Sequence, residues 1–137
     1  MSNLSKIRHG RHCVFKIHVH LVFVTKYRKS IFDRDALSTL EKVFSDVCKS
    51  FDAELTDFNG EREHVHLLIN YPPKVSLSKL VNSLKGVSSR LLKKEHPRLS
   101  EMYYKGKLWS PSYFAASCGG AHLSIIQEYI ENQQAPD

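Results

Sequence analysis

Cysteine is scarce in this chain of 137 residues, which contains three: Cys13, Cys48 and Cys118. Their number is odd, they lie far apart, and no two of them form a Cys-x-x-Cys pair. This pattern argues against a disulfide framework and gives no sign of a structural zinc site. We therefore expect reduced thiols.

Long apolar runs are also missing. No run approaches the roughly 18 residues that a membrane helix needs, and the basic segment MSNLSKIRHGRH lacks the apolar stretch of a signal peptide. The sequence has no internal repeat and no low-complexity segment. We expect a cytoplasmic protein without membrane contact, in which residues 1–12 form a basic N-terminal arm and residues 13–137 a single domain.

Basic residues outnumber acidic ones. The chain has 20 Lys and Arg against 14 Asp and Glu, a formal charge of +6, and an isoelectric point near 9.3. Such an excess favours a polyanionic partner, most often nucleic acid, although charge alone is weak evidence. The eight histidines are more informative, because four of them form two His-x-His pairs.

Residue periodicity predicts seven elements. The alternating apolar residues of CVFKIHVHLVFVTKY predict a long strand over residues 13–27. The other predicted elements are a helix over 34–51 capped by Asp33, strands over 53–60 and 63–70 that turn at Asn59-Gly60, a helix from Ser76 that stops before Pro97, a loop over 98–107, a strand over 108–118, and a helix from about 122 to 134.

The order of these elements indicates an α+β fold. The first six match the ferredoxin-like or RRM-like β-α-β-β-α-β pattern, in which an antiparallel sheet carries both long helices on one face. In that fold the first and third strands are central neighbours. The histidine-bearing faces of these two strands would then lie side by side on the outer face, which we expect another part of the structure to cover.

His64 and His66 form one His-x-His pair on a predicted strand. Because alternate side chains leave the same face of a strand, both imidazoles can share one metal ion. The alternative is a strand with two surface histidines of no function, a pattern that is common by chance. His18 and His20 form the second pair and would border the first, as supporting residues, ligands or DNA contacts.

Tyr129 and Gln133 lie four residues apart on the last predicted helix and share one face. A tyrosine on an amphipathic helix is usually a packing residue. Beside a histidine pair, however, these two residues suit phosphodiester chemistry. Two imidazoles and an amide oxygen can hold a divalent ion, and a phenol oxygen can act as nucleophile.

Several segments, in this order and spacing, resemble the single-tyrosine HUH transposases of small bacterial and archaeal insertion sequences (the two-hundred/six-oh-five type). They are HLVFVTKYR, GEREHVHLLINYPPK, LSKLVNSLKGVSSRLL, LWSPSYF and QEYIENQ. The resemblance covers roughly residues 13 to 134, and the joint pattern is far more specific than any one motif.

The resemblance implies that His64, His66 and Gln133 bind Mg²⁺ or Mn²⁺ and that Tyr129 is the catalytic nucleophile. Tyr129 would attack single-stranded DNA and leave a 5′-phosphotyrosine and a free 3′-OH. It also implies a homodimer whose subunits complete each other's active sites and bind hairpins at the element ends. The family commonly has Asp before the first motif histidine, and this chain has Glu63, for which we expect a supporting role.

Seven basic residues are candidates for contacts with DNA phosphates. They follow the first strand or lie on the second predicted helix: Lys26, Arg28, Lys29, Lys85, Arg90, Lys93 and Lys94. The alternative for the helix lysines is a solvated face. Aromatic residues that could stack on unpaired bases are Tyr27, Tyr103, Tyr104 and Trp109.

Other functions remain open at this stage. A domesticated relative that cuts dispersed palindromes would carry the same residues as an active transposase. A non-enzymatic RRM-like binding module would place stacking aromatics on the open sheet face, where this sequence has histidines. A phosphoesterase that uses water would explain the His-x-His pairs and leave Tyr129 without a role.

Overall fold

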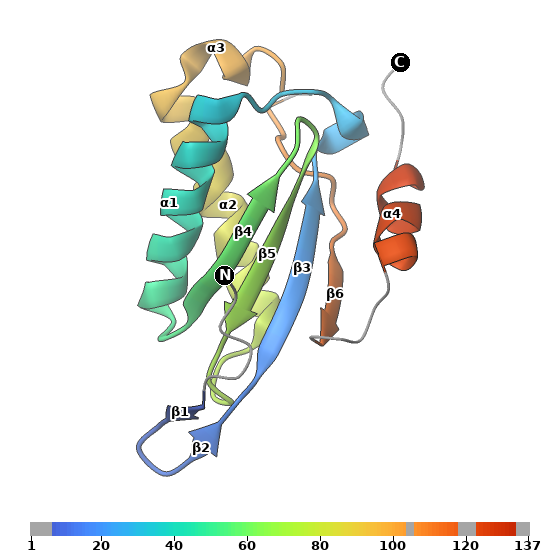
Figure 1. The fold of residues 1–137 in the computed structure, drawn as a ribbon. Helices are drawn as coiled ribbons and strands as arrows, with labels where there is room; N and C mark the ends of the chain where they lie inside the picture. Colours follow the sequence, from blue (N-terminus) through green and yellow to red (C-terminus); the bar gives the residue numbers. More distant parts are fainter. Residues whose placement is uncertain (1–6, 104–105, 118–122, 134–137) are drawn as a thin grey trace.

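A computed structural model describes residues 7–103, 106–117 and 123–133 (Figure 1). Within these ranges, no helix is both long and apolar enough to cross a membrane. The elements are β1 (Arg8–His9), β2 (Val14–Phe15), β3 (His18–Val24), the 3-10 helix η1 (Lys26–Arg28), α1 (Arg34–Ser50), β4 (Glu54–Gly60), β5 (His64–Asn70), α2 (Leu77–Glu95), α3 (Pro97–Ser100), β6 (Phe114–Ser117) and α4 (Leu123–Glu131).

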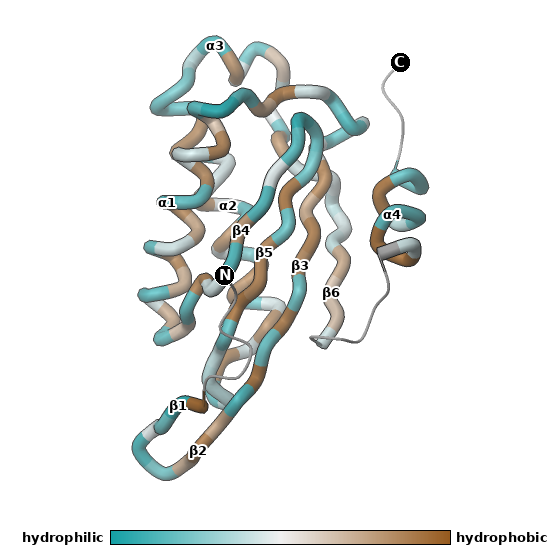
Figure 2. The backbone as a smooth tube through the Cα atoms, in the orientation of Figure 1, coloured by the Kyte–Doolittle hydropathy of each residue, from teal (hydrophilic) through white to brown (hydrophobic). Residues whose placement is uncertain are grey.

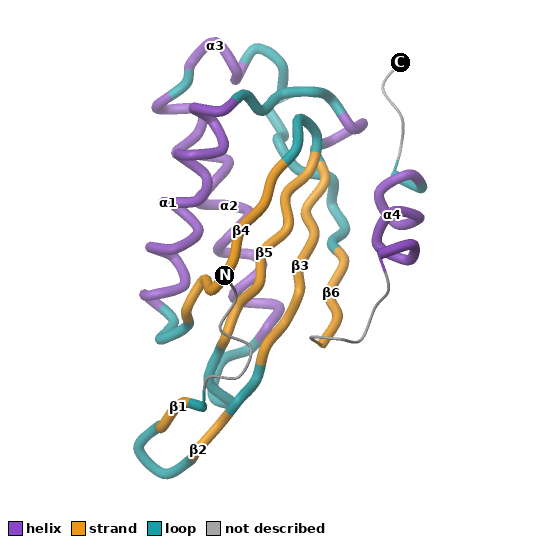
Figure 3. Tube along the Cα trace, in the orientation of Figure 1, coloured by secondary structure: helices purple, strands orange, loops and turns teal. Residues whose placement is uncertain are grey.

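The main sheet has four antiparallel strands in the order β4-β5-β3-β6. The central strands are β5 and β3, the third and first strands of the predicted pattern. Helices α1 and α2 cover one face of the sheet, and α4 stands against the other (Figures 1 and 3). The predicted α+β architecture with an additional C-terminal helix is therefore confirmed.

The alternation of side chains along β3 builds two separate apolar layers. Leu21 and Phe23 are fully buried in the core between the sheet and helices α1 and α2. Val22 and Val24 point to the opposite face, where they pack with Ile126 of α4. Figure 2 shows that α4 turns its hydrophobic side toward the sheet. This second layer fixes α4 on the histidine-bearing face.

Both long helices begin at the predicted caps. The side chain of Asp33 accepts a hydrogen bond from the Ala36 amide at 2.8 Å, which satisfies one free donor at the start of α1. Ser76 Oγ accepts a longer bond from the Lys79 amide at the start of α2. Helix α2 ends before Pro97, as predicted.

The strand predicted over 13–27 is divided, which corrects that prediction. Its first residues form β2, which pairs with β1 in a hairpin outside the main sheet. The described part of the basic arm thereby joins the domain. The Arg8 guanidinium donates to the carbonyl oxygens of Asn70 and Asp52, at 3.3 and 2.8 Å. The chain leaves the sheet again after β3, in the turn of η1.

The sequence predicted that the hairpin between β4 and β5 turns at Asn59-Gly60, and the structure corrects this prediction. Gly60 is the last residue of β4 and pairs with Val65, and the chain reverses just beyond it. A Cβ atom at Gly60 would collide with the side chain of Leu37 on α1. The glycine is therefore explained by the close approach of α1 rather than by turn geometry.

The C-terminal third contains shorter elements than predicted. Within the strand predicted over 108–118, the described strand residues are those of β6, and Cys118 lies outside the description. Helix α3 occupies the start of the loop predicted over 98–107. Helix α4 lies within the predicted helix over about 122–134 but ends at Glu131, because residues 132 and 133 are not helical; residues 122 and 134 lie outside the described residues.

Trp109 belongs to the core rather than to a base-stacking surface. Its ring packs against Phe23 and Phe32 with centroid separations of 5.7 and 5.4 Å, and its Nε1 donates to Ser88 Oγ at 3.0 Å. Tyr103 is also buried. The predicted stacking roles of both residues are thus wrong, while Tyr104 lies outside the described residues.

We predict that Ser88→Ala lowers the free energy of unfolding by about 1–3 kcal/mol, because it leaves the buried indole N–H of Trp109 without an acceptor. Urea denaturation followed by tryptophan fluorescence measures this change. The exposed Asn82 on the same helix provides the control, since Asn82→Ala should change stability by no more than about 0.5 kcal/mol. Equal stability of the two variants would contradict the prediction.

Candidate functional site

The His64–His66 pair lies on the outer face of the sheet. In the register between β3 and β5, His66 is opposite Val22 and His64 is opposite Val24. Both rings stand on the face that α4 partly covers, with ring centroids 4.9 Å apart and an interplanar angle of 79°. The predicted placement of the two imidazoles on one face is confirmed.

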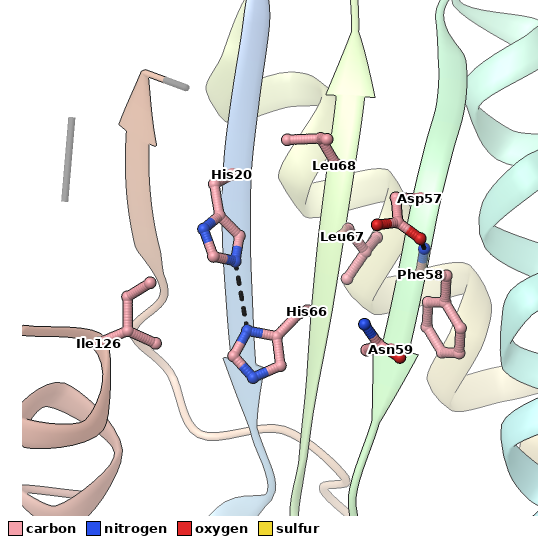
Figure 4. A pocket seen from close by; sticks show the side chains of 8 residues that line it. All are labelled: His20, Asp57, Phe58, Asn59, His66, Leu67, Leu68 and Ile126. Atoms are coloured by element: carbon pink, nitrogen blue, oxygen red, sulfur yellow. Dashed lines mark hydrogen bonds between the residues drawn. The ribbon is translucent and has the colours of Figure 1, made fainter. Parts of the chain in front are cut away.

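Each ring of the pair is held through its Nδ1 atom. His64 Nδ1 donates to Glu63 Oε1 at 2.6 Å, and His66 Nδ1 lies 3.2 Å from His20 Nε2, the contact drawn in Figure 4. Within the described residues, no hydrogen bond engages the Nε2 atom of either ring. A carboxylate on Nδ1 is the usual way in which a metal-binding histidine is oriented, with Nε2 left for the ion.

The electrostatic surroundings keep the inner histidine uncharged. Burial, followed by the proximity of His64 and His20, lowers the pKa of His66 to about 4. Burial also lowers the pKa of His20. At neutral pH the His66 ring is therefore neutral, which is the form that can donate a nitrogen lone pair to a cation.

A cavity of about 520 Å³ opens beside the pair. Its sheet-side lining includes Asn59 and the acidic residues Glu61 and Glu63, and Gln127 and Glu131 approach it from α4. Among the described residues, no three His, Cys, Asp or Glu side chains gather as a metal site.

Tyr129 lies on the other flank of α4, and Gln133 lies two residues beyond the end of that helix. The Tyr129 ring packs against Phe114 of β6 with centroids 5.6 Å apart, and its hydroxyl lies 2.7 Å from Ser112 Oγ. Gln133 Oε1 accepts a hydrogen bond from Ser110 Oγ at 2.9 Å. Burial raises the pKa of Tyr129, and the Ser112 hydroxyl partly offsets this rise.

The pairing of β3 separates this tyrosine from the histidine pair. Val22 is opposite His66 on one side and opposite Phe114 on the other. Because neighbouring strands lie about 4.8 Å apart, Phe114 and His66 are roughly 10 Å from each other across the sheet. Within this chain, the predicted group of two histidines, glutamine and tyrosine is thus divided into two halves on opposite flanks of α4.

Lys85 has a different place from the one predicted. Instead of standing on a phosphate-facing surface, its amine donates to the backbone carbonyls of Ser110 and Ser112 at 2.7 and 3.1 Å. Burial lowers the pKa of Lys85. Lys85 therefore ties α2 to the short loop whose hydroxyls contact Tyr129 and Gln133.

The other predicted basic residues fall into two groups. Arg90, Lys93 and Lys94 are exposed on α2, on the helical side of the sheet, away from the histidine pair. Lys26, Arg28 and Lys29 follow β3, and Arg28 lines the cavity beside the pair.

The second His-x-His pair is also divided. His20 borders the first pair as predicted, because it contacts His66. His18 is buried opposite Asn70, four residues along β3 from Val22, which faces the pair. Four strand residues span roughly 13 Å, so the prediction that His18 borders the pair is wrong.

Periodicity alone does not reveal the roles of Ser110 and Ser112 or of the second flank of α4. Ser110 and Ser112 lie in the quoted segment LWSPSYF, but a serine hydroxyl gives no periodic signal that would assign it a partner. Gln127 and Glu131 could have been found, because their spacing of four residues places them on one face of the helix beside the apolar stripe.

The family model of IS200-like transposases matches residues 13–133. The chain belongs to this family. A curated relative of this transposase is the ISDra2 transposase TnpA of Deinococcus radiodurans, 30% identical over 128 residues that span 93% of this chain and 91% of the relative. The transposase for insertion sequence element IS200 of Salmonella typhimurium is 28% identical over 118 residues, which span 86% and 77% of the two chains.

Solved structures agree with the fold of the transposase. A transposase structure from Deinococcus radiodurans aligns with a TM-score of 0.84 and 31% identity, covering 94% of this chain and 99% of the other. A tyrosine transposase bound to a REP hairpin aligns with a TM-score of 0.57 and 12% identity, covering 92% and 69%. At that identity the second likeness concerns the fold alone.

We predict that Ser112→Ala loosens α4 of the transposase. The Ser112 hydroxyl contacts both Tyr129 and Gln133, and a hydrogen bond of this kind contributes about 1 kcal/mol, so amide exchange within α4 should accelerate about 5-fold. Hydrogen exchange read by mass spectrometry measures the effect. Ser100, whose hydroxyl bonds the nearby Pro97 carbonyl, serves as control: Ser100→Ala should leave α4 unchanged. Unaltered exchange of α4 in Ser112→Ala would refute the prediction.

Proposed function

We propose that this transposase cuts and rejoins single-stranded DNA with Tyr129 as the nucleophile. The observation that carries the proposal is the His64–His66 pair, whose Nδ1 atoms are held by Glu63 and His20 while neither Nε2 atom has a hydrogen-bond partner in the described part of the chain. The Tyr129 oxygen forms a bond to phosphorus as the bond from phosphorus to the 3′ oxygen breaks. The products are a 5′-phosphotyrosine and a strand with a free 3′-OH, and the reverse reaction rejoins DNA without ATP.

A divalent ion, Mg²⁺ or Mn²⁺, fits the donor set of two imidazole nitrogens and one amide oxygen. His64, His66 and Gln133 would hold it, and Glu63 would keep the His64 ring in the orientation that points Nε2 at the ion. When bound, such an ion supplies Lewis-acid stabilisation of charge on the phosphate. The acidic residues Glu61 and Glu63 along the same cavity add negative charge that favours a cation.

The active unit that we propose is a homodimer with shared active sites. The Tyr129 hydroxyl is hydrogen-bonded to Ser112, and the Gln133 amide to Ser110. Val22 lies between these contacts and the histidine pair of the same chain. A helix from a second subunit could present both residues to the pair without crossing this barrier. The division of the site between the flanks of α4 supports this arrangement.

The proposed substrate is single-stranded DNA with hairpins near the ends of a mobile element. The protein would act on this DNA in the cytoplasm, at the nucleoid. The formal charge of +6 and the exposed Arg90, Lys93 and Lys94 support a nucleic-acid partner. A relative of the same fold is described as bound to a REP hairpin. Hairpin DNA is therefore the probe for the test below.

We predict that the wild-type protein forms a denaturation-resistant adduct with labelled single-stranded hairpin DNA in Mg²⁺ or Mn²⁺, detected on a denaturing gel. Tyr129→Phe should abolish the adduct and spare hairpin binding, because only the attacking oxygen is lost. His64→Ala should abolish cleavage through loss of the ion. If subunits share sites, a mixture of the two inactive variants should recover part of the activity.

The other outcomes of this experiment identify the alternatives. Cleavage that persists in Tyr129→Phe would favour a phosphoesterase that uses water. Hairpin binding without cleavage by the wild type, in either ion, would favour a binding module. An adduct formed on dispersed palindromes but not on element ends would favour a domesticated relative.

Glu63 provides a test of the metal site itself. We predict that Glu63→Gln weakens Mn²⁺ binding about 10- to 100-fold, because the His64 ring loses the carboxylate that orients it. Isothermal titration with Mn²⁺ measures the affinity without any DNA. The matched control is Glu61→Gln, which removes a carboxylate from the same cavity; Glu61 bonds His64 through its backbone amide, and no hydrogen bond joins its carboxylate to the His64 ring among the described residues. Equal losses in both variants would mean that only the general negative charge matters.

A further inference from the structure

The turn after β3 adopts a backbone conformation that side chains rarely take. Tyr27 has φ 59° and ψ 23°, and Arg28 has φ 52°. Two consecutive non-glycine residues in the left-handed region cost about 1–2 kcal/mol each. Such strain persists where the surrounding structure enforces it, and it often marks a functional position.

Several backbone bonds hold this turn in place. Thr25 is buried, and its hydroxyl donates to the Lys29 carbonyl at 2.8 Å, across the turn. The Arg28 amide donates to the Thr25 carbonyl at 2.9 Å. These bonds close the turn on itself and fix the direction in which Arg28 leaves the backbone.

The same turn is attached to the residues just before His64. The Thr25 amide donates to the Glu63 carbonyl at 2.9 Å, and the amides of Ile31 and Phe32 donate to the Arg62 carbonyl at 2.9 and 3.0 Å. The position of Arg28 is thereby coupled to the strand that carries the histidine pair. A shift of one would move the other.

The Arg28 side chain lines the cavity of the histidine pair, and one of its donors has no hydrogen-bond partner among the described residues. Among the described lining residues, Arg28 is the one that carries a permanent positive charge. Its Nε atom is buried and has no hydrogen-bond partner among the described residues. A buried donor left unsatisfied costs about 1–3 kcal/mol, a cost that a ligand oxygen would remove.

We propose that Arg28 contacts the scissile phosphate and stabilises the charge on its non-bridging oxygens during tyrosine attack. This inference rests on the function proposed above and adds to it a catalytic residue. The planar guanidinium matches two phosphate oxygens at once, which a lysine amine cannot do. Arg28 stays protonated throughout, so it transfers no proton and acts only by charge and hydrogen bonding.

The first experiment measures phosphate contact without catalysis. The probes are the dinucleotide dTpdT and its methylphosphonate analogue, which lacks the phosphate charge, each titrated into the full chain in Mg²⁺ and followed by NMR. Arg28→Asn removes the guanidinium, and asparagine tolerates the left-handed conformation of the turn. The wild type should bind dTpdT about 10-fold more tightly than the analogue, and Arg28→Asn should lose most of this preference.

Controls separate contact from structure. Arg34→Ala removes an exposed arginine of α1, outside the cavity, and should keep the wild-type preference. Arg28→Lys should keep a reduced preference for dTpdT over the analogue, because it retains the positive charge and loses the planar guanidinium that matches two phosphate oxygens. Equal weakening of both probes in Arg28→Asn would assign Arg28 a structural role and overturn the proposal. So would a wild-type protein that binds the two probes equally.

The second experiment tests the reaction. Arg28→Asn should lower the rate of adduct formation on hairpin DNA about 100- to 1000-fold, with hairpin affinity changed less than 2-fold. An unchanged adduct rate would exclude a catalytic role for Arg28. If the wild type itself forms no adduct but prefers dTpdT in an Arg28-dependent way, the phosphate contact stands and the proposed tyrosine chemistry fails.

Discussion

The pairing of β3 with two strands at once governs the geometry of the whole site. Val22 has His66 on one side and Phe114 on the other, and Ile126 of α4 packs onto it. Rotation about the side-chain bonds of Tyr129 alone does not remove this apolar contact, which lies between the phenol and the histidines. A helix, from this chain or from a second one, has to arrive as a unit for the two halves to meet.

The cavity beside the histidines combines charges of both signs. The neutral His66 and the neighbouring Glu61 and Glu63 favour a cation, while Arg28 favours an anion. A phosphodiester in contact with a bound cation satisfies both requirements, because its oxygens can meet the ion and the guanidinium together. Neither the cation-favouring residues nor Arg28 alone explains the cavity lining, since a site that binds only a cation would gain nothing from a nearby arginine.

Sequence periodicity predicted the elements whose side chains alternate regularly between two environments. The faces of β3 and β5 follow from the alternation of Leu21 and Phe23 with Val22. The central position of both strands followed from the ferredoxin-like order of elements, and the covering of the outer face from the histidines that it carries. The shared face of His64 and His66 followed in the same way, because a spacing of two residues fixes a common face.

What the sequence could not predict depends on contacts between distant segments. Lys85 looks like a solvated lysine until the loop carrying Ser110 and Ser112 folds over it and supplies two carbonyls. Gly60 looks like a turn glycine until α1 places Leu37 against it. The left-handed turn at Arg28 carries neither glycine nor asparagine, so its local sequence gives no sign of that backbone conformation.

The contacts that hold the Tyr129 flank of α4 are individually weak. The Phe114–Tyr129 ring pair and the Ser112 hydrogen bond each contribute about 0.5–1.5 kcal/mol. The fully buried Val22 and Val24 give the helix a continuous apolar seat. A second copy of α4 carries the same Ile126 and could pack on Val22 and Val24 equally well. Exchange of α4 between two subunits would then change which chain supplies the helix without changing the contacts. The apolar seat therefore sets where the helix rests, and the polar contacts of Tyr129 and Ser112 set which flank of it faces the histidines.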